Sequence, residues 1–99
     1  MLFAFMLFDA PGTAALRLEV RPEHKTYLGA VAERMAFAGP LLDDAGAMTG
    51  SLLVIDFTDR AAALAWLAVE PFTRAGVYGR SEVMAFRNLW PQKTGYPES

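Results

Sequence analysis

The chain has 99 residues, of which 54% are hydrophobic, and its formal net charge at pH 7 is −2. These values fit one compact domain and exclude a disordered chain. The chain has no cysteine, which excludes disulfides and thiolate chemistry. It also has no cluster of Lys and Arg, so we do not expect a nucleic acid as a partner.

The first predicted element is a strand over residues 1–8, MLFAFMLF, which ends at the turn-forming sequence Asp-Ala-Pro-Gly. This apolar segment is too short to span a membrane and lacks the basic start of a signal peptide. We therefore expect a cytoplasmic protein with no membrane partner. Residues 13–20 are expected to connect this strand to the next element, with at most a short helical turn.

The next predicted element is a helix that begins at Pro22. Proline is favoured at the first helical position, and Glu23 suits the positive end of the helix. Apolar residues follow at helical spacing as far as Met35, and a Gly-Pro pair ends the segment. Its last part, residues 35–42, can also form a short strand.

The second half of the chain predicts two strands around a helix. A strand over residues 49–57 is followed by Asp59, a favourable N-cap for a helix over residues 60–69. Pro71 is predicted to end this helix. After a loop, the last predicted strand covers residues 81–87.

The order strand, helix, strand, strand, helix, strand is that of the ferredoxin-like βαββαβ fold, an α+β class with an antiparallel sheet. The strands over residues 2–8 and 52–55 are apolar on both faces, whereas a half-solvated strand alternates. A second copy over the free face explains this pattern, so we expect a homodimer. The alternative is that the C-terminal tail folds across that face. We assign residues 1–88 to the domain and residues 89–99 to the tail.

His24 is the only histidine of the chain and the first candidate for chemistry. Leu28, Val31 and Met35 follow it at helical spacing, so its ring is expected on the buried face of the predicted helix. Near the start of that helix the positive helix end favours the neutral ring, which is the form that a general base needs. The alternative is a histidine that only hydrogen-bonds a loop.

Five further residues are candidates for a site around this imidazole. Glu70 can orient the ring through its second nitrogen, and Arg21 can bind an anionic group. Thr49 and Ser51 flank a glycine and can donate hydrogen bonds, and Phe72 offers an apolar wall. Each also has a plain structural reading as a solvated charge, a turn residue or a core side chain. No metal is expected, because no His-x-His or His-Glu-x-x-His spacing exists.

Five stretches, in this order and spacing, resemble the YCII-related (YciI-like) family. They are Arg21-Pro22-Glu23-His24, Ala38-Gly39-Pro40, Thr49-Gly50-Ser51 with the following LLVIDF, Glu70-Pro71-Phe72, and Ala75-Gly76-Val77-Tyr78. The resemblance runs from Met1 to about Phe86. It implies a dimeric α+β barrel and a site built on His24 and the acid at position 70. The family usually has Asp there, whereas this chain has Glu70.

The first functional hypothesis is a cofactor-independent isomerase or lyase. In it, His24 and Glu70 act as a general base on a small cyclic or carbonyl compound, while Arg21, Thr49, Ser51 and Phe72 bind it. No cofactor is expected. The alternative is a non-catalytic dimer that binds or senses a small ligand, and a third hypothesis is a purely structural dimer.

Overall fold

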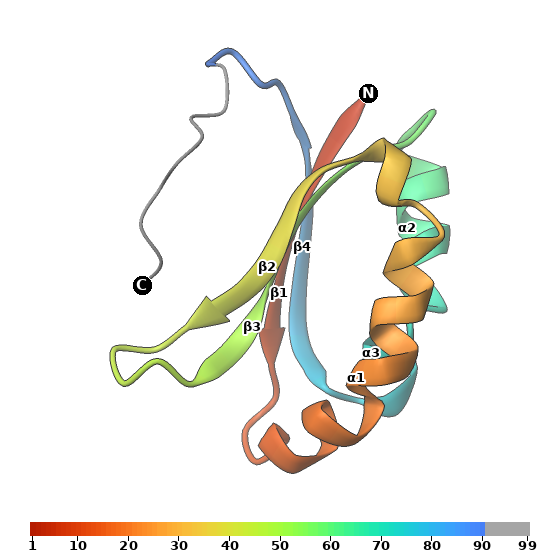
Figure 1. The fold of residues 1–99 in the computed structure, drawn as a ribbon. Helices are drawn as coiled ribbons and strands as arrows, with labels where there is room; N and C mark the ends of the chain where they lie inside the picture. Colours follow the sequence, from red (N-terminus) through yellow and green to blue (C-terminus); the bar gives the residue numbers. More distant parts are fainter. Residues whose placement is uncertain (91–99) are drawn as a thin grey trace.

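The computed structural model describes residues 1–90, which form an antiparallel sheet with all helices on one side (Figure 1). The strands are β1 (Leu2–Asp9), β2 (Met35–Leu42), β3 (Met48–Asp56) and β4 (Tyr78–Phe86). The helices are α1 (Ala14–Gly29), α2 (Arg60–Ala68) and α3 (Pro71–Ala75), with a short 3₁₀ turn, η1 (Ala32–Arg34), before β2.

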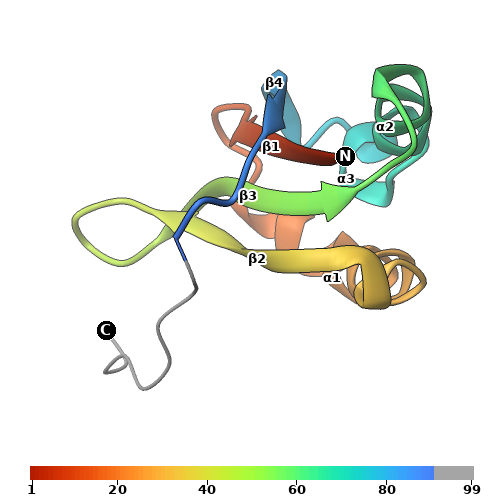
Figure 2. The same cartoon turned by 90° about the horizontal axis from the view of Figure 1, so that it is seen from above.

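The four strands lie in the order β2-β3-β1-β4, and every neighbouring pair is antiparallel. Seen from above, β2 and β4 form the two edges of the sheet (Figure 2). α1 connects β1 to β2, and α2 with α3 connects β3 to β4, which is the ferredoxin-like arrangement. The predicted fold class is therefore confirmed.

The first helix begins at Ala14 and not at Pro22, so the prediction of a connector over residues 13–20 is wrong. Pro22 lies inside α1, where a proline costs about 3 kcal/mol because it lacks the N–H of a helix interior. The turns before it remain helical because Arg17 is buried there and forms an ion pair with Asp9.

This longer helix changes the setting of His24. The residue lies in the middle of α1, far from its first turn. Because the helix dipole acts mainly on groups in the first and last turns, it has little effect on this ring. The prediction that the positive helix end favours the neutral form of the imidazole is therefore wrong.

The predicted loop before the last strand contains the short helix α3. Pro71 occupies the first turn of α3, and Glu70 is its N-cap. The helix ends at Gly76, whose φ of 83° is a left-handed conformation that turns the chain towards β4. β4 accordingly begins at Tyr78, earlier than the predicted Ser81.

The core lies between the helices and the sheet. Its buried apolar side chains are Phe3, Phe5, Leu7, Val31, Leu53, Ile55, Phe57, Ala63, Leu67 and Val83. The odd-numbered residues of β1, and of β3 from Ser51 onward, thus point towards the helices, and the even-numbered ones point away from them. The alternation breaks at the start of β3, where the register with β2 shifts next to Met48.

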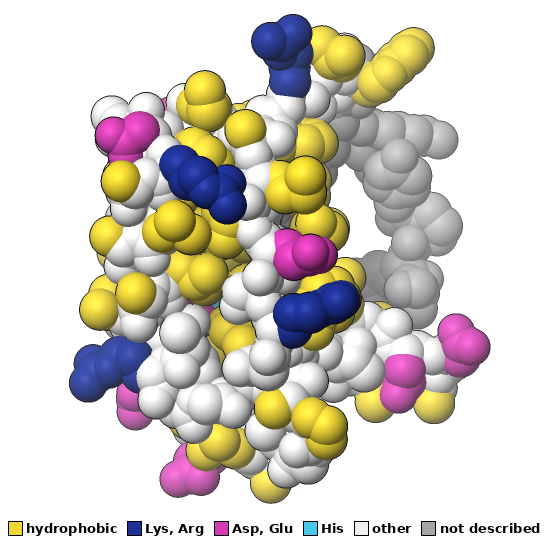
Figure 3. Space-filling view, turned by 180° about the vertical axis from the view of Figure 1, so that it is seen from behind, with side chains coloured by type: hydrophobic (Ala, Val, Ile, Leu, Met, Phe, Trp, Pro, Cys, Tyr) yellow, Lys and Arg dark blue, Asp and Glu magenta, His cyan; other side chains and the backbone are white. Residues whose placement is uncertain are grey.

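The surface of the sheet away from the helices, which we call the outer face, is also apolar. Its apolar side chains are Leu2, Ala4, Met6, Phe8, Phe37, Leu52, Val54, Met84 and Phe86, and Asp56, Arg80 and Glu82 lie on the same face. Met84 is 57% exposed, and Phe37 and Phe86 are each 38% exposed. From behind, hydrophobic side chains reach the surface along this side of the molecule (Figure 3). Residues 2–8 of β1 and 52–55 of β3 are therefore apolar on both faces, as the sequence predicts.

The domain boundary at residue 88 and the tail over residues 89–99 stay predictions. Of that tail the structure describes only Leu89 and Trp90, which are both exposed. Among residues 1–90, no helix is long and apolar enough to cross a membrane.

Candidate functional site

The centre of the candidate site is a contact between His24 and Glu70. α1 directs the His24 ring towards the sheet, and the residue is only 8% exposed. Its Nδ1 lies 2.5 Å from Oε1 of Glu70, a residue that is fully buried. The sequence Glu-Pro-Phe creates this position, because Pro71 opens α3 and leaves Glu70 as its N-cap beside α1.

Glu70 is held in place by the backbone of its own helix. Its Oε1 accepts a hydrogen bond of 3.2 Å from the backbone N–H of Phe72. Its Oε2 is buried and has no hydrogen-bond partner within the described part of the chain. A buried carboxylate with few partners is costly unless a charged or polar group is close. The His24 ring is therefore the principal partner of this carboxyl group.

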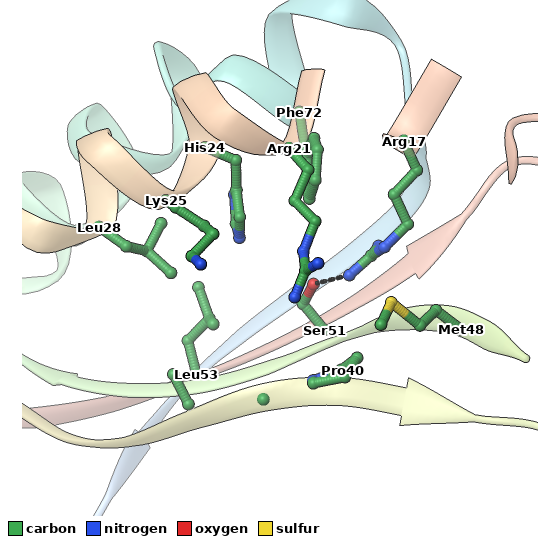
Figure 4. Close-up of a pocket in the computed structure, with 12 residues that line it drawn as sticks. Arg17, Arg21, His24, Lys25, Leu28, Pro40, Met48, Ser51, Leu53 and Phe72 are labelled. Atoms are coloured by element: carbon green, nitrogen blue, oxygen red, sulfur yellow. Dashed lines mark hydrogen bonds between the residues drawn. The ribbon is translucent and has the colours of Figure 1, made fainter. Parts of the chain in front are cut away.

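Phe72 fixes the plane of the imidazole. The two rings are stacked, with centroids 3.9 Å apart and planes inclined by 11°. Phe72 is fully buried, and its ring also contacts Tyr78 edge-on at 5.7 Å. With Nδ1 held by Glu70 and the plane held by Phe72, the second nitrogen of His24, Nε2, is left on the side of the pocket (Figure 4).

A second polar cluster lies beside this pair and was not predicted from the sequence. Nη1 of Arg17 donates to both carboxylate oxygens of Asp9, at 2.9 and 3.1 Å. Its Nη2 donates to Oγ of Ser51 at 3.0 Å, and the hydroxyl of Tyr78 donates to the same Oγ at 3.1 Å. The Arg17 guanidinium also lies 4.8 Å from the ring centroid of Phe72. The cluster therefore joins α1, β1, β3 and β4 beneath the pocket.

A spacing signal for Arg17 exists, but the position of Pro22 concealed it. Arg17, Arg21, His24 and Leu28 follow one another at intervals of three or four residues, which places them on one helix face. Because the helix was predicted to begin at Pro22, Arg17 fell in the connector. Tyr78 was part of a motif of the resemblance, but no chemical role was predicted for it.

Between α1 and the sheet lies a cavity of about 150 Å³, which we call the pocket. It is lined by Arg17, Arg21, His24, Lys25, Leu28, Ala38, Gly39, Pro40, Met48, Ser51, Leu53 and Phe72. Besides the imidazole of His24, the ionisable side chains among them are Arg17, Arg21 and Lys25, which are all cationic. Arg21 and Lys25 are exposed and have no ion-pair partner among residues 1–90. The pocket thus has a positively charged rim.

Most of the predicted site residues meet at this pocket. Arg21, Ser51 and Phe72 line it together with His24, and Glu70 contacts the imidazole from behind. Thr49 does not line the pocket. It is exposed near the β2–β3 turn, and its hydroxyl donates to the carbonyl oxygen of Leu41 on β2 at 3.4 Å.

Burial changes the acidity of the phenol next to the pocket. Burial, followed by the charge of Glu70, raises the pKa of Tyr78 well above its ordinary value of 10.0. The hydrogen bond to Ser51 and the charge of Arg17 act in the opposite direction, but the effect of burial is larger. Tyr78 therefore keeps its proton at neutral pH and remains a hydrogen-bond donor.

The described residues contain no group of three or more His, Asp or Glu side chains that could hold a metal ion. The chemical groups that reach the pocket are the imidazole, a hydroxyl and the cationic side chains at its rim. This set can take up a proton, donate a hydrogen bond and bind an anion.

The fold and the site together define a small ferredoxin-like α+β domain with a histidine–carboxylate pair beside a pocket. A model of the YCII-related domain matches residues 1–87, and the chain belongs to this family. Protein YciI of Escherichia coli O6:H1 (strain CFT073) is 33% identical over 98 residues, which covers 91% of this chain and 100% of that protein.

Solved structures show the same fold. The 5-chloro-2-hydroxyhydroquinone dehydrochlorinase TftG of Burkholderia phenoliruptrix AC1100, in complex with 2,5-dihydroxybenzoquinone, matches with a TM-score of 0.82 and 27% identity. The match covers 88% of this chain and 94% of TftG. An antibiotic biosynthesis monooxygenase matches with a TM-score of 0.53 and 18% identity, over 90% of this chain and 99% of that one, and shows the fold alone.

Proposed function

We propose that the protein is a small-molecule enzyme that eliminates a leaving group from, or isomerises, a small cyclic compound by proton transfer without a cofactor. The observation that carries this proposal is the 2.5 Å contact between Nδ1 of His24 and Oε1 of Glu70, which leaves Nε2 for the pocket. A carboxylate on one ring nitrogen fixes the tautomer and orientation that the other nitrogen needs as a general base.

The size of the pocket supports a substrate with one ring. An apolar protein cavity of about 150 Å³ holds one benzene molecule. The pocket has about this volume, and it is open to solvent beside the cationic rim. Leu28, Leu53 and Phe72 supply apolar contacts for a ring, and the polar groups lie at its edge.

In the proposed step, Nε2 of His24 takes a proton from a carbon or hydroxyl of the ring. In an elimination, the released electron pair forms a new double bond while the leaving group departs as an anion. In an isomerisation, the pair moves to a conjugated oxygen, and the imidazolium returns the proton to another atom. Glu70 stabilises the imidazolium, and Arg21 and Lys25 stabilise the negative charge on the substrate.

Elimination is the better supported of the two reactions. TftG, which is 27% identical and has a TM-score of 0.82, is a dehydrochlorinase of a chlorinated hydroxyhydroquinone. Its complex holds 2,5-dihydroxybenzoquinone, a single ring with oxygen substituents. Such a ring fits the volume and the charge of the pocket described here.

We also propose that the enzyme works as a homodimer in the cytoplasm. The outer face is an apolar surface whose Met84, Phe37 and Phe86 are exposed in the single chain. Pairing two such faces would complete a dimeric α+β barrel, and obligate homodimers bury roughly 2,000 Å² or more. The absence of cysteine from the sequence fits the reducing cytoplasm.

A second candidate function is a non-catalytic module that binds or senses a small ligand. One observation favours it: the described residues that line the pocket include one imidazole, that of His24, and no carboxyl side chain. A reaction that needs a separate acid and base would lack one of them, whereas a binding module needs neither. Catalytic turnover distinguishes the two functions.

The experiment compares wild type with His24→Gln and Glu70→Gln, and uses Thr49→Ala as a control outside the pocket. Chloride release from 5-chloro-2-hydroxyhydroquinone measures elimination, and NMR follows deuterium exchange at the ring carbons of 2,5-dihydroxybenzoquinone. We expect the rate of His24→Gln to fall by about 100-fold or more, because general base catalysis contributes a factor of this size. The rate of Thr49→Ala should equal that of wild type. Equal rates for wild type and His24→Gln refute the proposed base, and binding without any turnover in wild type supports the binding module.

A further inference from the structure

We propose that Ser51 is held as a hydrogen-bond donor towards the pocket and forms, with Arg21 and Lys25, a subsite for a negatively charged oxygen of the ligand. The ligand class is a one-ring phenolate, ionised hydroxyquinone or enolate. This inference deepens the function proposed above and rests on the same pocket, but it concerns binding and not proton transfer.

The hydrogen-bond capacity of Ser51 carries the argument. A serine hydroxyl has one hydrogen to donate and two lone pairs that accept. Nη2 of Arg17, 3.0 Å from Oγ, belongs to a guanidinium and can only donate. The hydroxyl of Tyr78, 3.1 Å away, keeps its proton and has no other acceptor within the described chain. Both lone pairs of Oγ are thus engaged, and its hydrogen is left for the pocket.

The neighbours of Ser51 make this arrangement rigid. The Arg17 guanidinium is fixed by two hydrogen bonds to Asp9 and by the ring of Phe72. Ser51 itself is only 2% exposed and lies in the middle of the sheet on β3. Because Asp9 balances the charge of Arg17, this arginine is a positioning residue and leaves the ligand charge to other groups.

Two cations without described partners supply the complementary charge. In Figure 4, the side chains of Arg21 and Lys25 extend from α1 towards the sheet. The guanidinium of Arg21 lies beside Ser51, and the ammonium of Lys25 lies further along α1, on the side of Leu28. No acidic side chain lines the pocket. A ligand that presents an oxygen anion to Ser51 therefore finds one hydrogen-bond donor and nearby positive charge, while a ligand that presents an N–H group to Ser51 finds no free lone pair on its Oγ.

This polarity also suits the proposed reaction. When Nε2 of His24 takes a proton, the electron pair left on a conjugated substrate moves to an oxygen. An oxygen placed at Ser51 receives that charge where a donor already stands and positive charge is near. The subsite therefore favours rings whose oxygen is negative in the bound state or becomes negative during the reaction.

The test measures binding of two probes of equal shape, 4-nitrophenolate and 4-nitroaniline, to the full chain. Wild type is expected to bind the phenolate more tightly. Ser51→Ala should weaken phenolate binding by about 10-fold to 100-fold, because it removes one hydrogen bond to a charged group. Its affinity for 4-nitroaniline should equal that of wild type. Tyr78→Phe frees one lone pair of Oγ and should bring the two affinities closer. Thr49→Ala, on the same strand, should change neither affinity.

Thermal melting establishes that each variant is folded before binding is measured. The proposal is overturned if folded Ser51→Ala binds 4-nitrophenolate like wild type, if both probes weaken equally, or if wild type prefers 4-nitroaniline. The two proposals fail separately. Absence of ring-proton exchange in wild type removes the base role of His24 and leaves the subsite, whereas an unchanged affinity in Ser51→Ala removes the subsite and leaves the base.

Discussion

Replacing Glu70 tests the contact on which the proposed site depends. In Glu70→Gln the amide oxygen can still accept from His24 and from the backbone of Phe72, but without a negative charge. A hydrogen bond to a charged group contributes about 1.5–3 kcal/mol, against about 1 kcal/mol for a neutral one. Two such bonds therefore predict a loss of about 1–4 kcal/mol in the free energy of unfolding.

Glu70→Ala removes the acceptor entirely. It leaves the N–H of Phe72 and Nδ1 of His24 buried without a partner, and each such group costs about 1–3 kcal/mol. We expect a loss of about 2–6 kcal/mol, which is a large part of the 5–15 kcal/mol that stabilises an ordinary domain. The Glu70→Ala variant should thus be clearly less stable than Glu70→Gln.

Urea unfolding at pH 7 and at one protein concentration gives these values, because a dimer makes the midpoint depend on concentration. Glu23→Gln is the matched control: this glutamate is exposed on the same helix as His24, and its loss should change stability by less than about 0.5 kcal/mol. If Glu70→Gln is as stable as Glu23→Gln, the charge of Glu70 does not stabilise the His24 contact and the reasoning is refuted.

Three further outcomes follow from the described residues. Light scattering should give about twice the chain mass of 10.8 kDa. Met84→Glu on the outer face should halve the measured mass, while Leu18→Glu on the exposed side of α1 should leave it unchanged. A monomeric wild type contradicts the proposed dimer. Arg17→Met should cost about 3–5 kcal/mol in urea unfolding, because it leaves Asp9, whose side chain is only 9% exposed, without its cation. A loss below about 1 kcal/mol contradicts the structural role of this pair. Burial raises the pKa of Tyr78, so its neutral form stabilises the fold fully below pH 10, and this contribution decreases as the pH rises above 10. Above pH 10 the wild type should therefore lose stability faster than Tyr78→Phe. Parallel pH profiles of unfolding free energy for the two proteins contradict this prediction.

The fold could be predicted from the sequence because its strands and turns are indicated by local sequence patterns. The apolar run of residues 1–8, the N-cap Asp59 and the order of elements were enough for the ferredoxin-like topology. The start of α1 was wrong because proline is normally a helix-start signal, and only the tertiary contacts of Arg17 keep the preceding turns helical. Such contacts cannot be read from local propensity.

The candidate site was predictable to the extent that it follows a helix face or a motif. The spacing of His24 and Leu28 placed the imidazole on the buried side of its helix, and the resemblance placed an acid at position 70. The link between Arg17, Ser51 and Tyr78 joins three elements distant in sequence, and it depends on strand register. No short-range pattern encodes that register.

On β3 from Ser51 onward, side chains that face the pocket side and side chains of the outer face alternate residue by residue. Ser51 and Leu53 point to the pocket, while Leu52 and Val54 belong to the outer face. The two surfaces can therefore diverge independently during evolution: substitutions at even positions alter what the sheet associates with, and those at odd positions alter what the pocket accepts. Insertion of a single residue in this strand would exchange the two sets, so point substitution is the route by which a relative acquires a new ligand and keeps its assembly.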